Sequence, residues 1–177
     1  MNYKNLLLLC CLLFSFSCAT EKKDSFPHQD RKFTSTVFPK PVGFINDFDA
    51  VFSEKEEANL LKLVKKHQAE TSNQIAVVTI NDMANYVAIE KYSLDLANYW
   101  GVGLKGKDNG VLITIHVKNR KLWIQNGDGI TSKLTDAETK HIIDTQITPF
   151  YKKDDYYGGT YKGIEHIIKE LSKADDN

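Results

Sequence analysis

Hydrophobic and polar positions along the chain follow two periods, one typical of helices and one typical of strands. Ser53 and Glu56 form a capping box, which predicts a helix over 54–70. Residues 75–80 are a short continuous run of mainly apolar residues, the pattern of a strand covered on both faces. Apolar residues at helical spacing then predict a helix over 89–100.

Two more apolar segments, 111–117 and 121–125, are separated by a short polar turn near Asn119. This arrangement predicts a β-hairpin. With the turn at that position, Val111 lies opposite Asn126 in the paired strands. The loop before the first strand and the loop after the second strand then meet at the same end of the sheet.

A second capping box, formed by Thr135 and Glu138, starts a helix that we expect to end before Pro149. A last helix covers about residues 159–172. The resulting order is helix, strand, helix, strand, strand, helix, helix. It predicts an α/β fold with three α/β/α layers around a mixed central sheet that contains the hairpin.

The hairpin brings together two loops rich in glycine and in polar oxygen atoms. One loop carries Asp108 and Asn109, and the other carries Asp128. Carboxylate and amide oxygens are hard ligands suited to Ca²⁺ or Mg²⁺, so these residues are candidate metal ligands. The alternative is a simple turn, because Asp and Asn bond their own backbone in turns and Gly110 can adopt positive φ.

The N-terminal segment has the order of a secretion signal. Lys4 precedes an apolar run, which is followed by small residues and Cys18. The end of the segment resembles the lipobox of bacterial lipoproteins, with Ser15 where leucine is usual. We therefore expect a lipoprotein signal peptide over 1–17 and a lipidated Cys18 that anchors the protein to a membrane of the cell envelope. An ordinary secretory signal and an uncleaved anchor are the alternatives.

The rest of the chain divides by composition. Residues 18–40 are polar and without periodicity, which predicts a flexible tether. Residues 41–172 are long enough for one domain, and 173–177 form a polar tail. Cleavage before Cys18 would leave no other cysteine, which excludes disulfides, zinc–thiolate sites and a cysteine nucleophile from the domain.

Charge excludes one class of partner. The predicted signal contains a single charged residue, Lys4, so its removal changes 23 basic and 23 acidic residues to 22 and 23. No basic patch interleaved with aromatic residues is present, and we expect no nucleic-acid partner. We expect an envelope protein complex as the partner.

Several sequence blocks in a fixed order resemble the TPM domain, named for thylakoid, phosphatase and modulator proteins. The resemblance covers about Phe44 to Leu171. It rests on GFINDFD at 43–49, QIAVVT at 74–79, YWGVG at 99–103, KDNGVL at 107–112, Arg120, GDG at 127–129, LTD at 134–136 and PF at 149–150.

The resemblance implies an α/β/α fold, a secreted or membrane-attached location, and Ca²⁺ binding or acid phosphatase activity in some members. Acidic or amide positions of the family are matched by Asp47, Asp108, Asn109 and Asp136, so the resemblance adds Asp47 and Asp136 to the candidate metal ligands. Asp128 lies where the family tolerates other residues. Many members also carry a transmembrane helix after the domain, which we do not expect here.

Two functions are therefore expected. In the first, the domain binds a divalent cation and assists membrane-protein complexes. In the second, the cation supports hydrolysis of small phosphomonoesters by a metal-assisted acid phosphatase. The DxDxV form of 47–51 also occurs in haloacid-dehalogenase phosphatases, but the domain is small for that fold and a helix follows at once. The sequence identifies no nucleophile or general base, which favours the binding function.

Overall fold

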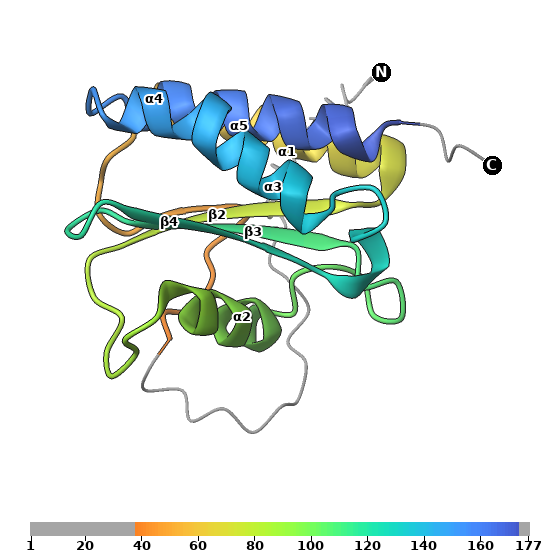
Figure 1. The fold of residues 1–177 in the computed structure, drawn as a ribbon, viewed down its shortest axis with the longest axis horizontal. Helices are drawn as coiled ribbons and strands as arrows, with labels where there is room; N and C mark the ends of the chain where they lie inside the picture. Colours follow the sequence, from red (N-terminus) through yellow and green to blue (C-terminus); the bar gives the residue numbers. More distant parts are fainter. Residues whose placement is uncertain (1–37, 174–177) are drawn as a thin grey trace, which may run out of the picture.

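A computed structural model describes residues 38–173. The expected signal peptide, Cys18 and almost all of the tether lie outside the described residues. The centre of the fold is a four-stranded sheet with the strand order β1-β2-β3-β4 (Figure 1). The first three strands are parallel and β4 is antiparallel to β3, so the predicted mixed sheet with a hairpin is confirmed. The strands are β1 Ile45–Asp47, β2 Gln74–Ile80, β3 Gly110–His116 and β4 Lys121–Asn126.

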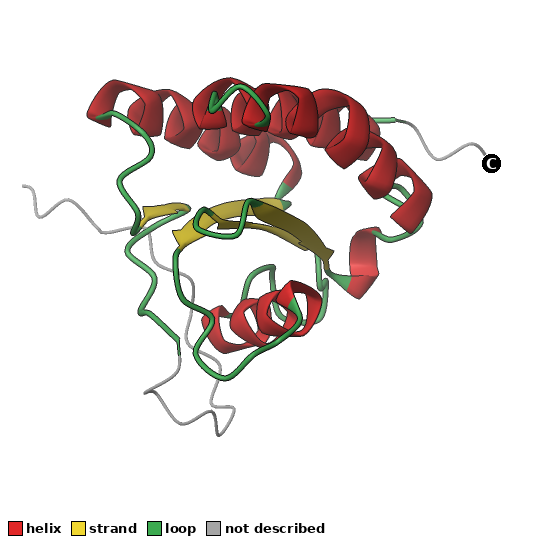
Figure 2. Cartoon of the chain, turned by 60° about the vertical axis from the view of Figure 1, so that its left-hand side comes forward, coloured by secondary structure: helices red, strands yellow, loops and turns green. Residues whose placement is uncertain are grey.

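Helices cover both faces of this sheet, which confirms the α/β fold. One helix, α2, packs on one face, and α1, α3, α4 and α5 lie together on the other (Figures 1 and 2). Every residue of β2 and β3 is buried, as expected for strands covered on both sides. The helical segments are α1 Glu54–Thr71, α2 Ile89–Trp100, η1 Asp128–Ile130, α3 Asp136–Ile142, the π-helical η2 Ile143–Ile147, α4 Thr148–Tyr151 and α5 Tyr156–Leu171.

The two crossover connections have opposite hands. The chain moves across the sheet in one direction, from β1 to β2 to β3, but α1 and α2 lie on opposite faces (Figure 1). Because parallel crossovers in one direction with the same hand put their helices on the same face, one of the two must be the rare left-handed form. This arrangement leaves α2 alone on its face, beside β3 and β4.

Both predicted capping boxes are present. The Ser53 hydroxyl accepts a hydrogen bond from the backbone N–H of Glu56, whose carboxylate accepts from Ser53 N in return. Thr135 and Glu138 make the same pair of bonds at the start of α3. These bonds satisfy N–H groups that have no partner within a helix, so the sequence marks both helix starts accurately.

The structure differs from the prediction by one additional strand and by the end of one helix. The three-residue strand β1 was not predicted, because so short a segment has no measurable period. The helix after Thr135 does not end before Pro149, which lies inside α4. The preceding turn widens, and Thr148 N donates to Ile143 O, five residues back. A proline lacks an N–H group and its ring collides with the carbonyl of an ordinary helical turn, so the wider turn admits it.

The last helix also begins earlier than predicted, at Tyr156, because the carboxylate of Asp155 accepts the backbone N–H of Gly158 and caps it. No helix between residues 38 and 173 combines the length and apolar character needed to cross a membrane.

Candidate functional site

The hairpin has the predicted register, with Val111 paired to Asn126. Its outer loops lie side by side at one end of the sheet. The backbone N–H of Gly127 donates to Gly110 O over 2.8 Å, and Gly129 N donates to Asp108 O over 3.1 Å. These two bonds extend the hairpin beyond its strands and fix the loop of Asp128 against the loop of Asp108.

The two loop backbones are in direct contact, which only glycine permits at two positions. A Cβ atom on Gly127 would overlap the carbonyl oxygen of Asp108, and one on Gly129 would overlap that of Lys107. The GDG sequence therefore has a geometric reason, since its glycines let two chains approach without side chains between them.

Asp108 itself has a strained backbone, with φ of 47° in the left-handed region. Asp is among the residues that tolerate this conformation, but it must be held there. The following residue, Asn109, provides the restraint. Its side-chain oxygen accepts Leu104 N over 2.9 Å, and its amide group donates to Ser72 O and to the Asn73 side chain over 3.0 and 3.1 Å.

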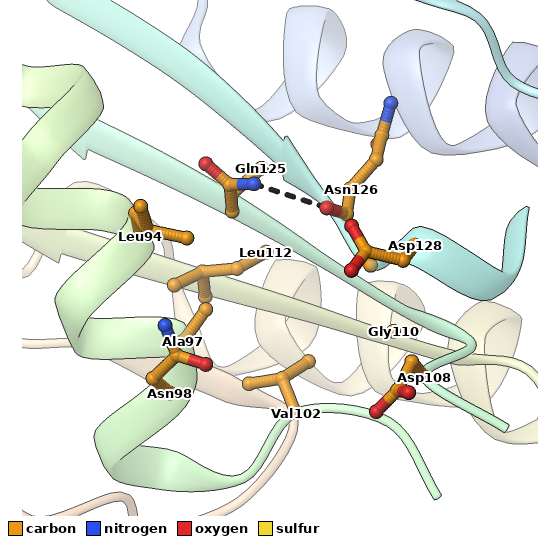
Figure 3. Close-up of a pocket in the computed structure, with 11 residues that line it drawn as sticks. Leu94, Ala97, Asn98, Val102, Asp108, Gly110, Leu112, Gln125, Asn126 and Asp128 are labelled. Carbon is orange, nitrogen blue, oxygen red and sulfur yellow. Dashed lines mark hydrogen bonds between the residues drawn. The ribbon is translucent and has the colours of Figure 1, made fainter. Parts of the chain in front are cut away.

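These loops border a pocket of about 300 Å³ between the end of the hairpin and α2 (Figure 3). The carboxylates of Asp108 and Asp128 lie at one side of the pocket and Leu94, Leu112 and Val102 lie toward the other (Figure 3). The lining residues are Leu94, Ala97, Asn98, Val102, Asp108, Gly110, Leu112, Gln125, Asn126, Gly127 and Asp128. Within the described chain, no basic side chain forms an ion pair with Asp108 or Asp128.

The structure therefore brings two of the five predicted ligands, Asp108 and Asp128, to one pocket. Asn109 is adjacent in sequence but does not line it. This residue is 5% exposed, and its side-chain oxygen and nitrogen are both engaged in the bonds that hold the loop. Its position is that of an anchor for Asp108.

Asp47 lies at the opposite end of the sheet. It aligns with Thr79, and Thr79 aligns with Ile115, whereas Asp108 precedes the start of β3. At about 3.3 Å per residue, Asp47 and Asp108 are more than about 15 Å apart, so one cation cannot bind both. The Asp47 carboxylate instead accepts the Thr79 hydroxyl over 2.5 Å and Phe52 N over 2.7 Å, which closes the loop between β1 and α1.

Asp136 is also outside the pocket lining. It occupies the exposed first turn of α3, where a carboxylate interacts favourably with the helix dipole. Arg120 lies in the hairpin turn, at the opposite end of the hairpin from Asp108, and forms an exposed 2.6 Å ion pair with Asp154.

The donor set of the pocket fits a hard cation only loosely. Between residues 38 and 173, no three His, Cys, Asp or Glu side chains gather closely enough to hold a metal ion. The oxygen ligands that this end of the hairpin offers are the two carboxylates, the side-chain amide of Gln125 and carbonyl groups of the loops. That set has the right chemistry for Ca²⁺ or Mg²⁺ but few charged ligands.

Sequence reasoning missed two residues of this region. Gln125 lies opposite Leu112 on the pocket side of the hairpin, and its amide donates to Asn126 O over 3.0 Å. Gln74, buried at the start of β2, accepts Gly103 N over 2.8 Å. The predicted register would have placed Gln125 on this face, whereas no local pattern indicates the contact of Gln74.

Comparisons with known proteins agree with the fold. The N-terminal domain of a protein from P. gingivalis, solved by NMR, has a TM-score of 0.67 and 23% identity, covering 72% of this chain and 81% of that one. The N-terminal domain of cg2496 from Corynebacterium glutamicum has a TM-score of 0.58 and 15% identity, covering 87% and 93%. The BA42 protein of the psychrophilic bacterium Bizionia argentinensis has a TM-score of 0.62 and 20% identity, covering 73% and 91%.

No curated protein sequence matches the chain. A family model does, and it spans β1 to the last turn of α5, including both loops of the pocket. Because the model of the TPM domain matches residues 45–170, most of its length, the chain belongs to the TPM domain family.

Proposed function

We propose that this TPM domain binds a hard divalent cation, Ca²⁺ in preference to Mg²⁺, at the pocket of Asp108 and Asp128. The observation that carries the proposal is the locked pair of loops. Two backbone hydrogen bonds join them, and the carboxylates that they present have no ion-pair partner within the described residues. A cation would neutralise both carboxylates at once.

The number and type of oxygen ligands also determine the affinity that we expect for the cation. Ca²⁺ takes six to eight oxygen ligands and tolerates irregular geometry, whereas Mg²⁺ requires a near-octahedral shell. With only two carboxylates, the site resembles weak extracellular calcium sites, for which dissociation constants are on the order of 10⁻⁴–10⁻³ M. Such a site would respond to the ion concentrations outside the cytoplasm.

We further propose that lipidated Cys18 holds the domain at the envelope, where the cation orders the two loops and the domain assists a membrane-protein complex. The lipobox-like sequence before Cys18 supports the anchor. Acyl chains on that residue would place the full-length protein in the membrane fraction. Cys18→Ser should move it to the soluble fraction, and unchanged membrane recovery would contradict the lipid anchor.

The pocket lining supports binding more than catalysis. It contains no His, Cys, Ser, Thr, Tyr, Lys or Arg side chain. A phosphatase needs a nucleophile or base and groups that bind phosphate. For the first role the lining would offer only its two carboxylates and the water on a bound cation, and for the second it has amide groups but no cationic side chain. The alternative function, metal-assisted acid phosphatase activity, can be tested with p-nitrophenyl phosphate at acidic pH, with and without added Ca²⁺.

The test of the cation site is a calorimetric Ca²⁺ titration of residues 19–177, which include every residue that the structure describes. We expect saturable binding that Asp108→Asn and Asp128→Asn each weaken at least fivefold. Asp136→Asn is the matched control, because that carboxylate is exposed but outside the pocket. Equal affinity in all four proteins would overturn the assignment, and so would a lack of binding up to 10 mM.

A further inference from the structure

The pocket between the hairpin and α2 has two chemically different parts. The side toward α2 is mainly apolar, with Leu94, Ala97, Val102 and Leu112, and it also carries the amide side chain of Asn98. The other side carries the carboxylates of Asp108 and Asp128 (Figure 3). A bare cation would use only the carboxylate side, so the apolar side calls for another occupant.

Leu94 shows that the apolar side continues to the surface. It is 41% exposed, whereas Leu112, which lines the same pocket from β3, is fully buried. An exposed apolar residue that borders a pocket is a common feature of contact surfaces. The pocket volume of about 300 Å³ is at the lower limit for a small-molecule site and is sufficient for one long side chain.

A lysine side chain has the matching chemistry, since an apolar stem of four carbons ends in a compact ammonium group. Its stem would pack on the exposed Leu94 while its ammonium group reaches the carboxylates. We propose that the pocket receives a lysine side chain from a partner protein, with the ammonium group between Asp108 and Asp128. Charge complementarity identifies this occupant, because both carboxylates lack an ion-pair partner within the described chain.

This proposal shares its carboxylates with the cation site, and in that respect it rests on the proposed function. A lysine and a cation would compete, so each would weaken the binding of the other by the same factor. Envelope Ca²⁺ would then control docking of the partner. The two ligands differ in one respect: a bare cation would use only the carboxylates, whereas the lysine would also contact the apolar side of the pocket.

The first test uses ¹⁵N-labelled residues 19–177 in the presence of chelator. Nα-acetyl-lysine N-methylamide is titrated, and Nα-acetyl-norleucine N-methylamide serves as the matched probe without the charge. In ¹H–¹⁵N NMR spectra, we expect saturable changes in the amide chemical shifts of Leu94, Val102, Gly110 and Asp128. Only the lysine probe should produce them. The double variant Asp108→Asn/Asp128→Asn should reduce the affinity at least tenfold, and Asp82→Asn should leave it unchanged. Equal responses to both probes, or no shifts at the pocket, would overturn the proposal.

A second measurement separates this proposal from the cation site. The lysine titration is repeated at saturating Ca²⁺, and we expect the affinity to fall at least fivefold. If Ca²⁺ does not bind but lysine does, the cation site fails and lysine recognition stands. If Ca²⁺ binds and lysine does not, the partner proposal fails alone. Pocket shifts that depend on protein concentration without any probe would identify a second copy as the occupant and also overturn the proposal.

Discussion

The side-chain oxygen of Gln74 accepts the backbone N–H of Gly103 over 2.8 Å, and both residues are buried. Gln74 begins β2, and Gly103 lies in the loop that leads to Asp108. One side chain therefore fixes the start of the central strand to the loop of the candidate site. Asn109 O accepts the backbone N–H of the same residue, Gln74, over 3.1 Å. The loop is thus anchored at both ends.

We expect Gln74→Leu to lower the free energy of unfolding by about 1–3 kcal/mol, because it leaves the buried Gly103 N–H without a partner. It should also weaken Ca²⁺ binding, since the loop of Asp108 would lose one anchor. Urea unfolding and calorimetry measure the two effects. Gln68→Leu on α1 is the control, with the same chemical change at a half-buried position and an expected loss below about 0.5 kcal/mol. Equal losses at both positions would contradict the role of Gln74.

The contrast between Gln74 and Asp128 shows what the sequence can predict. The hairpin follows from local patterns, a polar turn between two apolar segments, and its register alone places Asp128 beside Asp108. Gln74 contacts a residue 29 positions away in the sequence. Whether two such distant residues meet depends on how the chain packs, which no local pattern shows. Asp47 was grouped with Asp108 through the family resemblance, which gives no position in space. The undetected strand β1 places Asp47 at the other end of the sheet.

The close contact of the two loops predicts the effect of a single methyl group. We expect Gly129→Ala to destabilise the protein by about 1–3 kcal/mol, because the new Cβ overlaps Lys107 O and the backbone must move. The movement would separate Asp108 from Asp128, so Ca²⁺ binding should weaken as well.

A loop glycine in open space provides the control for this substitution. A Cβ on Gly106 would meet no atom within 4 Å, and its φ of +77° is one that asparagine tolerates. Gly106→Asn should therefore change stability by much less than Gly129→Ala. Thermal unfolding of both variants tests the prediction, which fails if Gly129→Ala unfolds at the temperature of the unsubstituted protein.

The pKa of Asp49 is raised, first by burial and second by the negative charge of Asp47, while His116 and Asn81 oppose the shift. When a carboxyl group has a higher pKa in the folded state than in the unfolded state, its ionisation disfavours folding. The loss of stability begins as pH rises past the pKa of the unfolded state and is complete above the pKa of the folded state. We expect Asp49→Asn to be more stable than the unsubstituted protein at pH 7, with a difference that shrinks toward pH 4. Urea midpoints at the two pH values would show it, and a variant less stable at pH 7 would contradict it.

His67 should have the opposite effect to Asp49, because it should reduce the stability of the protein as pH falls. It is 2% exposed on α1, and burial lowers the pKa of its imidazole, with a smaller opposing effect of Glu70. Above the unfolded value of about 6.5, His67 is neutral in both states and its packing is fully effective. As pH falls below that value, the unfolded state binds the proton first, and stability declines by up to about 1.4 kcal/mol per pH unit until the folded pKa is reached.

We therefore expect His67→Gln to lose less stability than the unsubstituted protein between pH 7.5 and pH 5.5, measured by urea unfolding. The difference between the two proteins should grow as pH falls below about 6.5, because only the unsubstituted protein gains a proton on residue 67 when it unfolds. Glutamine keeps a polar group near Thr71, whose hydroxyl lies 3.3 Å from His67 Nε2. His141→Gln, on the exposed surface of α3, should retain the original pH dependence. If the two variants decline in parallel with the unsubstituted protein, the acid sensitivity arises elsewhere in the domain.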